Sequence, residues 1–166
     1  MKKLNIALVA HDARKSELCD WVKWNKNPLS QHNLFATGTT AKVVSESCGS
    51  DVHALLSGPL GGDQQIGSMI AEGKIDILIF FCDNLITQGH QQDVGALVRL
   101  ASLYNIGFAT NRTTADMLLT SPLFGNEDYD RIIPKSIYNY SHRFDGDVDK
   151  TDENVDVIDE TVEQDI

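Results

Sequence analysis

The stretch from Ser57 to Gln65 concentrates the residues that could do chemistry. It reads Ser-Gly-Pro-Leu-Gly-Gly-Asp-Gln-Gln, so three glycines and a proline precede the carboxylate of Asp63. Glycine allows tight turns and lets a ligand approach the main chain closely. Helical spacing begins at Asp63, so this residue is either the N-cap of a helix or a catalytic group. The residue types leave both interpretations open.

Other polar residues follow apolar segments of the chain. They are His11 and Asp12, Thr37 to Thr40, Ser57 and Gly58, Asp83, and Thr110 and Asn111. If each apolar segment is a strand of one open parallel sheet, these residues share the edge where ligands bind. Hydroxyls and glycine amides at a helix start, as in 37–40, suit a phosphate. Lys15, one turn into the first predicted helix, could add a positive charge.

Each of these residues also has a purely structural interpretation. Thr39 or Thr40 could only cap a helix, and the same holds for Asp63 and Asp93. His11 and His90 could be ordinary loop histidines. The functional interpretation therefore depends on convergence, because several weak polar signals fall on one predicted edge.

Strand and helix alternate along the chain. Apolar runs predict strands at 4–10, 32–36, 52–56, 75–81 and 106–109, and helical spacing predicts helices at 16–24, 41–47, 63–72 and 93–104, with a last helix capped within 110–114 and ending at 119. The alternation predicts one three-layer α/β/α domain with a five-stranded parallel sheet, Rossmann-like or flavodoxin-like, and helices on both faces. Beyond Ser121 the periodicity fades, although Ile132 and Ile133 could add a short strand.

The negative charge belongs mainly to one end of the chain. The 166 residues carry a formal charge of -10, but residues 145–166 hold ten of the 24 acidic residues and a single lysine. Residues 1–144 are therefore nearly neutral, which argues against a nucleic-acid-binding face. We expect a folded domain over 1–144 and an acidic, disordered tail over 145–166.

Cysteine usage and hydropathy favour a cytoplasmic protein. The three cysteines show neither a disulfide framework nor a metal-ligand spacing. No apolar stretch reaches the ~20 residues of a membrane helix, and the N-terminus lacks the pattern of a signal peptide. We expect a reduced, soluble protein that does not enter membranes.

Four segments resemble the methylglyoxal synthases. They are 6–12 (IALVAHD), 36–40 (ATGTT), 56–65 (LSGPLGGDQQ) and 76–81 (DILIFF). The likeness runs from about Leu4 to Arg143, and the Gly-Gly-Asp-Gln-Gln block after Ser-Gly-Pro is specific to that family. The resemblance implies conversion of dihydroxyacetone phosphate to methylglyoxal and inorganic phosphate by a carbon–oxygen lyase that uses no metal and no organic cofactor.

The resemblance also implies residue roles. Asp63 would be the general base, His11 and His90 would flank the substrate oxygens, and Asp83 and Asp93 would be supporting carboxylates. The phosphate would lie on Lys15, Thr37, Thr39, Thr40, Ser57 and Gly58, and Arg143 resembles an arginine that the family supplies from a neighbouring subunit. A homohexamer that responds allosterically to inorganic phosphate is implied as well.

The chain departs from the family pattern at two places. Ala41 stands where the motif continues with glycine, and the loop 84–92 lacks the usual proline. Domains of the same fold also serve as regulatory modules in carbamoyl phosphate synthetases, so a phosphate-sensing module is the alternative. The retention of Asp63, His11, His90, Asp83 and Asp93 together favours the enzyme.

Overall fold

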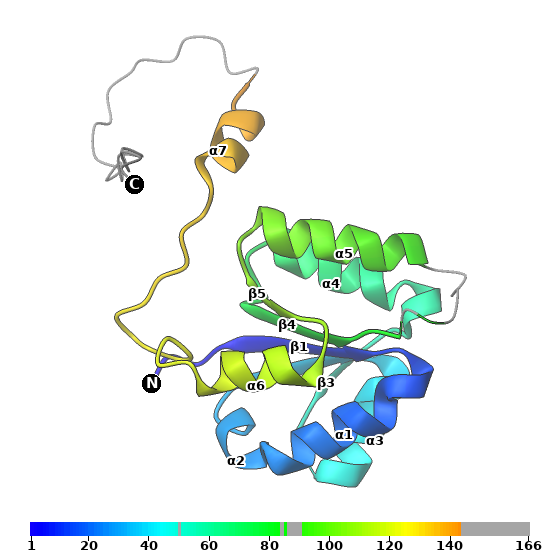
Figure 1. Cartoon of the computed structure of the whole chain (residues 1–166). Coiled ribbons are helices and arrows are strands. Elements are labelled where there is room, and N and C mark those ends of the chain that lie inside the picture. Colours follow the sequence, from blue (N-terminus) through cyan, green and yellow to red (C-terminus); the bar gives the residue numbers. More distant parts are fainter. Residues whose placement is uncertain (50, 84, 86–90, 144–166) are drawn as a thin grey trace, which may run out of the picture.

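The computed structural model describes residues 1–49, 51–83, 85 and 91–143 (Figure 1). The side chains of residues 47, 48 and 91–93 lie outside this description. In the part described, no helix combines the length and the apolar character needed to cross a membrane.

A five-stranded parallel sheet forms the centre of the domain. Its strands are β1 (Asn5–Ala10), β2 (Asn33–Thr37), β3 (His53–Leu55), β4 (Ile77–Phe81) and β5 (Gly107–Ala109). They lie in the order β3-β2-β1-β4-β5, with β1 paired to both β2 and β4. The predicted parallel sheet is confirmed, and the strand order is that of a Rossmann-type half.

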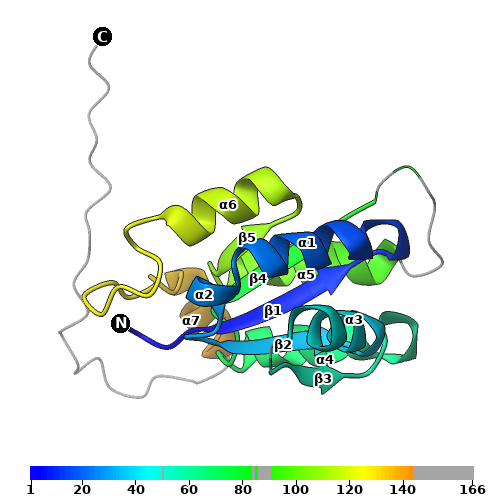
Figure 2. The same ribbon diagram turned by 90° about the horizontal axis from the view of Figure 1, so that it is seen from below.

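Helices cover both faces of the sheet. The chain forms α1 (Lys15–Trp24), α2 (Lys26–Leu29), α3 (Gly38–Cys48), α4 (Gly62–Ala71), α5 (Gln91–Leu103), α6 (Arg112–Thr120) and α7 (Lys135–Ser141), with short 3-10 turns η1 (Asp12–Arg14) and η2 (Gly58–Leu60). The pair α4 and α5 covers one face, while α1, α2, α3 and α6 lie on the other (Figures 1 and 2). The predicted three-layer architecture is therefore confirmed.

The alternation of side chains along β1 explains how the two faces are filled. Ile6 and Leu8 join a cluster with buried residues of α1 and α3, whereas Ala7 and Val9 join a second cluster with residues of α4 and α5. Successive side chains of a strand point to opposite faces. Because helices cover both faces of the sheet, β1 is apolar and buried from Ile6 to Ala10. The near-continuous apolar run of β4 has the same cause.

The segment after α6 crosses the amino end of the sheet, and we call residues 121–131 the strap. The strap is tied to the start of the chain, since the Lys2 amide donates to the Gly125 carbonyl at 2.8 Å and the Lys2 ammonium pairs with Asp130 at 2.6 Å. On the opposite side, the Arg131 Nη1 donates to the Ile75 carbonyl at 3.2 Å. These contacts join residues more than fifty positions apart, which explains why periodicity fails to predict them.

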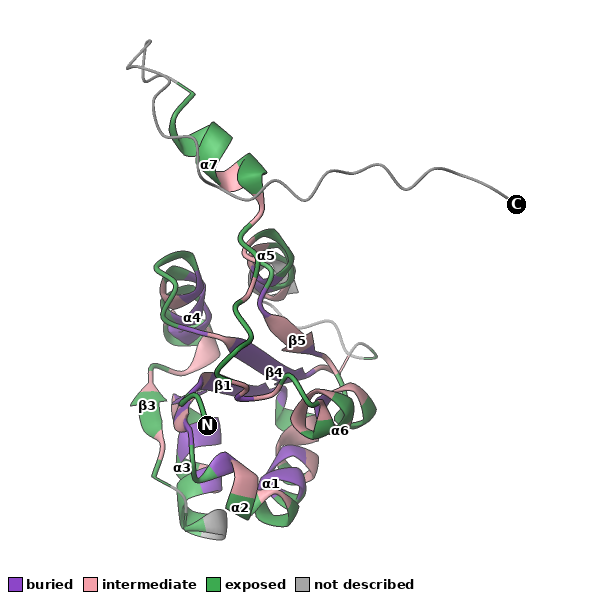
Figure 3. Cartoon of the chain, turned by 90° about the vertical axis from the view of Figure 1, so that its left-hand side faces the viewer, coloured by how far each residue is buried: buried purple, intermediate pink, exposed green. Residues whose placement is uncertain are grey.

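The C-terminal part of the described chain departs from the prediction. Ile132 and Ile133 form no strand and are exposed. The helix α7, which the sequence did not predict, stands apart from the sheet beyond the α4–α5 layer (Figures 1 and 3). Its Tyr138 and Tyr140 are about two-thirds exposed, at 64% and 68%. The helix α7 therefore projects from the body that the sheet and its covering helices form.

Candidate active site

The strand order reverses between β1 and β4, and ligands of open α/β sheets bind outside the carboxyl ends of the strands at such a point. His11 follows β1 and Asp83 follows β4 by two residues. The Asp83 amide donates to the His11 Nδ1 at 2.8 Å, and the His11 amide donates to the Phe81 carbonyl at 3.2 Å. These two bonds fix the imidazole at the reversal point of the sheet.

The bond from Asp83 also determines what His11 can offer a ligand. The side chain is only 6% exposed, and its ring meets the Phe80 ring edge-on with centroids 5.1 Å apart. A ring nitrogen that accepts a hydrogen bond carries no proton, so the neutral ring carries its proton on Nε2. His11 is therefore oriented as a donor through Nε2.

Threonines at the end of β2 form the second part of the edge. Thr37 and Thr40 are buried, and their hydroxyl oxygens lie 3.4 Å apart, whereas Thr39 is exposed. Thr37 is the N-cap of α3 and makes no side-chain capping bond. The alternative in which Thr39 or Thr40 caps the helix is therefore wrong, because both residues lie within its first turn.

Two glycines bring α4 back against the end of β3. Gly61 has φ +103°, in the left-handed region that favours glycine. A Cβ at Gly62 would lie 2.0 Å from the Leu56 carbonyl oxygen, far inside any allowed contact. The same segment is held from the other side, because the Leu56 amide donates to the Gln65 Oε1 at 2.8 Å. The contribution of Gln65 was not predicted, although it belongs to the block that carried the family resemblance.

Asp63 is the second residue of α4, and the N-cap is Gly61. The N-cap interpretation of Asp63 is therefore wrong. Its side chain is 3% exposed and lies against the backbone after β3, because a Cβ added at Gly58 would be 3.0 Å from Oδ2 and 3.3 Å from Oδ1. The absence of a side chain at Gly58 is what makes room for this carboxylate.

Positive charges lie at the start of α1. The Lys15 ammonium pairs with the Asp12 carboxylate, and the Lys15 side chain is 19% exposed. The neighbouring Arg14, which was not predicted as a site residue, pairs with Glu17 at 3.2 Å. Burial raises the pKa of the Cys82 thiol after β4, and the positive charge of Arg14 opposes this rise. The signal for Arg14 was its position beside Lys15 in the turn after β1.

Three predicted residues remain, namely His90, Asp93 and Arg143. His90 and the side chain of Asp93 lie outside the described residues. Arg143 follows α7 by two residues, and its Nη1 donates to the Tyr140 carbonyl at 2.7 Å while its guanidinium carbon lies 3.6 Å from the centre of the Tyr140 ring. The roles of these three residues stay predictions.

The arrangement defines a class of protein. It is an open α/β domain with an imidazole donor at the reversal point, hydroxyls and a helix start suited to an anion after β2, and a buried carboxylate after β3. Carboxylate and imidazole are the groups that proton transfer beside a carbonyl requires. Among the described residues, no three His, Cys, Asp or Glu side chains gather into a metal-binding group.

Comparisons with known proteins identify the family. Residues 17–110 match the family model of the MGS-like domain. The methylglyoxal synthase of Proteus mirabilis is 61% identical over 123 residues, which cover 74% of this chain and 81% of that protein. The methylglyoxal synthase of Yersinia enterocolitica is 52% identical over 139 residues, covering 80% and 91%. A crystal structure of methylglyoxal synthase from Elizabethkingia anophelis aligns with TM-score 0.78 and 44% identity, covering 89% of this chain and 94% of that one. The chain belongs to the methylglyoxal synthase family.

Proposed function

We propose that this protein is a methylglyoxal synthase, a carbon–oxygen lyase that converts dihydroxyacetone phosphate to methylglyoxal and inorganic phosphate. The observation that carries the proposal is the buried position of the Asp63 carboxylate against Gly58. Relatives and a solved structure that bear this name, with 44% to 61% identity, support it.

In the proposed reaction, Asp63 takes a proton from the hydroxymethyl carbon next to the ketone. The electron pair of the broken C–H bond forms a carbon–carbon double bond to the ketone carbon, the π electrons of the carbonyl move to its oxygen, and an enediolate forms. His11 donates from Nε2 to an oxygen where negative charge develops, and we assign His90 as a second donor. A donor aimed at a developing oxyanion contributes about 10²- to 10³-fold to such steps.

The second step expels phosphate. The proton of the hydroxyl on the former hydroxymethyl carbon passes to the enediolate oxygen, and that carbon becomes the aldehyde. The electron pair of the enediolate double bond forms a new double bond to the ester-bearing carbon as the bond from that carbon to the phosphate ester oxygen breaks. The resulting enol takes up a proton at its terminal carbon and gives up its hydroxyl proton to the released phosphate, which yields methylglyoxal. We assign the phosphate to Lys15, Thr37, Thr39, Thr40, Ser57 and Gly58. A rigid cradle can hold the breaking bond out of the enediolate plane, which elimination requires.

Two opposing effects act on the charge of Asp63. The first turn of α4 favours the carboxylate form through the helix dipole, whereas burial disfavours it. We propose Asp83 and Asp93 as supporting carboxylates, and a like charge near Asp63 would favour proton uptake further.

The decisive experiment compares Asp63→Asn with the unchanged protein. Methylglyoxal and phosphate released from dihydroxyacetone phosphate are measured together with the melting temperature. Loss of a general base predicts a fall in kcat of about 10²- to 10⁴-fold, with the variant still folded. The matched control is Asp20→Asn, an exposed carboxylate on α1, which should leave turnover unchanged. Equal turnover in Asp63→Asn and the unchanged protein would refute the assignment, and phosphate binding without any product would favour a regulatory module.

We also propose a homohexamer in which Arg143 completes the site of a neighbouring subunit and inorganic phosphate acts as a regulator. The projecting position of α7, two residues before Arg143, supports this assignment. Mixing inactive Asp63→Asn with inactive Arg143→Gln subunits should restore activity, because some sites in the mixed oligomer then hold both native residues. If Arg143 acts within its own chain, the mixture stays inactive.

The remaining assignments concern the limits and location of the protein. We propose that residues 1–144 form the enzyme domain and that 145–166 are an acidic appendage, with the protein in the cytoplasm. The charge of the tail supports this division, since ten acidic residues accompany one lysine there. Removal of 145–166 should therefore leave the enzyme domain folded.

A further inference from the structure

A cavity of about 190 Å³ lies at the amino end of the sheet. Asp76 and Ile77 line it at the start of β4, Gly107 lines it at the start of β5, and Leu4 lies just before β1. The proposed active site is at the other end of the same strands, about 16 Å away along the five residues of β4. The cavity is therefore separate from the proposed active site.

The strap lines one side of this cavity and is held in place by polar contacts. The Met1 ammonium pairs with Glu127 at 2.6 Å, and the Asn105 amide nitrogen donates to the Ile132 carbonyl at 3.0 Å. Lys2 adds its bonds to Gly125 and Asp130 described above. A strap that is anchored at both ends leaves a preformed, partly open space, and small-molecule sites are usually preformed clefts of this kind.

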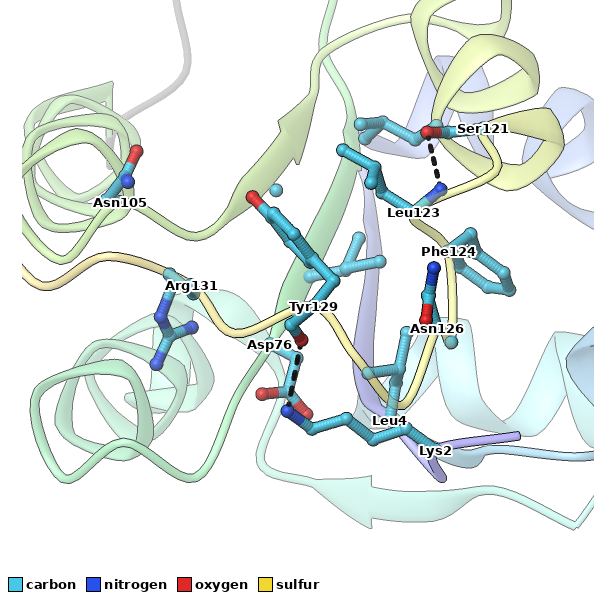
Figure 4. Close-up of a pocket in the computed structure, with 14 residues that line it drawn as sticks. Lys2, Leu4, Asp76, Asn105, Ser121, Leu123, Phe124, Asn126, Tyr129 and Arg131 are labelled. Atoms are coloured by element: carbon cyan, nitrogen blue, oxygen red, sulfur yellow. Dashed lines mark hydrogen bonds between the residues drawn. The ribbon is translucent and has the colours of Figure 1, made fainter.

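The wall of the cavity combines opposite charges with an apolar surface. Arg131 and Asp76 lie on one side and Leu123 and Phe124 on the other (Figure 4). Arg131 uses Nη1 for the Ile75 carbonyl, and its Nε is buried away from the cavity. Its Nη2 makes no hydrogen bond to another described residue and is not buried. Nη2 is therefore the donor left for a ligand in the cavity.

Asp76 offers the complementary charge. One of its carboxylate oxygens accepts from the Asn5 amide at 2.8 Å, and the residue is half-buried. Within the described part of the chain, neither Arg131 nor Asp76 takes part in an ion pair. The ammonium of Lys2, which also lines the cavity, is engaged by Asp130. One cation and one carboxylate thus face the same small space.

We propose that this cavity binds a small zwitterion with an apolar body, namely an α-amino acid with an aliphatic side chain. Its carboxylate would bind Arg131, its ammonium group would bind Asp76, and its side chain would pack on Leu123 and Phe124. A cavity of ~150 Å³ can hold a benzene molecule, so 190 Å³ suits a ligand of roughly eight heavy atoms. The volume of the cavity and the opposite charges of Arg131 and Asp76 together favour this class of ligand.

Calorimetric titration of the full chain with L-leucine and L-valine tests the proposal. We expect binding of both amino acids, weakened about tenfold or more in N-acetyl-L-leucine, which lacks the ammonium group, and in L-leucinamide, which lacks the carboxylate. These analogues test the charge requirement without altering the protein. Absence of binding by both amino acids at tens of millimolar, or equal binding of the neutralised analogues, would overturn the proposal.

Two variants locate the binding. Asp76→Asn keeps an acceptor for the Asn5 amide, and Arg131→Gln removes the guanidinium; each should weaken L-leucine about tenfold or more. The matched controls are Asp128→Asn and Arg112→Gln, which are exposed and lie outside the cavity lining, and they should bind as the unchanged protein does. Unchanged affinity in both cavity variants places the ligand elsewhere and refutes the site. If no form of the protein binds the amino acids and the two cavity variants form smaller oligomers, the proposal is refuted and the cavity instead belongs to a contact with a neighbouring subunit.

Discussion

Replacement of Gly62 by alanine should separate the geometry of the site from its chemistry, because it adds one methyl group and changes no charge. The new Cβ would lie 2.0 Å from the Leu56 carbonyl oxygen. Carbon and oxygen rarely approach closer than about 3.3 Å. A gap of about 1.3 Å must therefore open between the end of β3 and the start of α4, directly beside Asp63.

The magnitude follows from this displacement. A misplacement of about 1 Å can reduce catalysis about 100-fold, so kcat/KM for dihydroxyacetone phosphate should fall by about that factor in Gly62→Ala. Forcing a methyl group into a packed position also costs about 1 to 3 kcal/mol of unfolding free energy. Product release and urea denaturation measure the two effects separately.

Gly95→Ala is the matched control. Gly95 lies in α5, and no atom lies within 4 Å of a Cβ added there. Alanine is favoured over glycine in a helix interior by roughly 0.5 to 1 kcal/mol, so this variant should be slightly more stable and equally active. If Gly62→Ala behaves like Gly95→Ala in both assays, the close approach at Leu56 does not position Asp63 and the reasoning is wrong.

Two further predictions concern histidines. His11→Asn keeps an oxygen near the position of Nδ1 to accept from the Asp83 amide but removes the Nε2 donor, so kcat should fall about 10²- to 10³-fold with little change in melting temperature. For His32, burial and the positive charge of Lys3 lower the pKa below its ordinary 6.5, while Asp76 opposes them. The unfolded chain therefore binds the proton first, and stability should fall as pH drops below about 6.5 toward the folded-state pKa. Denaturation at pH 7 and pH 5 should show a larger loss in the unchanged protein than in His32→Asn.

The outcomes that would contradict these expectations are specific. A His11→Asn variant that unfolds at much lower temperature would show that the imidazole acts chiefly in packing. For His32, parallel stability profiles in the two proteins would mean that another group causes the acid sensitivity. The Leu4 amide, which donates to the His32 Nδ1 at 3.1 Å, should then still exchange slowly at pH 5.

The order of strands and helices was predictable because each of them leaves its own local pattern of apolar residues in the sequence. The apolar run ending at Phe81 fixed β4, and the polar residues after β1 and β4 were expected at one edge. The predicted ends of the strands and helices were less accurate, since hydrogen bonding to the neighbouring strand decides where a strand ends. Val52 and Leu56 flank β3 outside its three paired residues, and α3 begins at Gly38 instead of Ala41 because Thr37 already has the extended conformation of an N-cap.

Contacts between segments that lie far apart in the sequence were not predicted. The role of Gly62 depends on the carbonyl of Leu56 across a turn, and the sequence shows only that a glycine is present. The strap depends on Met1 and Lys2 meeting residues more than a hundred positions away. No periodic signal carries such information, because it arises only when the whole sheet has formed. The cavity beneath the strap was unpredictable for the same reason.

The hydrogen bond from the Asp83 amide to the His11 Nδ1 makes this imidazole a spectroscopic reporter. In a nitrogen NMR spectrum, the ring nitrogen that accepts a bond and the one that carries the proton give well separated resonances. A substrate analogue placed at the reversal point of the sheet would perturb the protonated nitrogen most strongly. Occupancy of the site could therefore be followed in a protein that performs no turnover, including the Asp63→Asn variant.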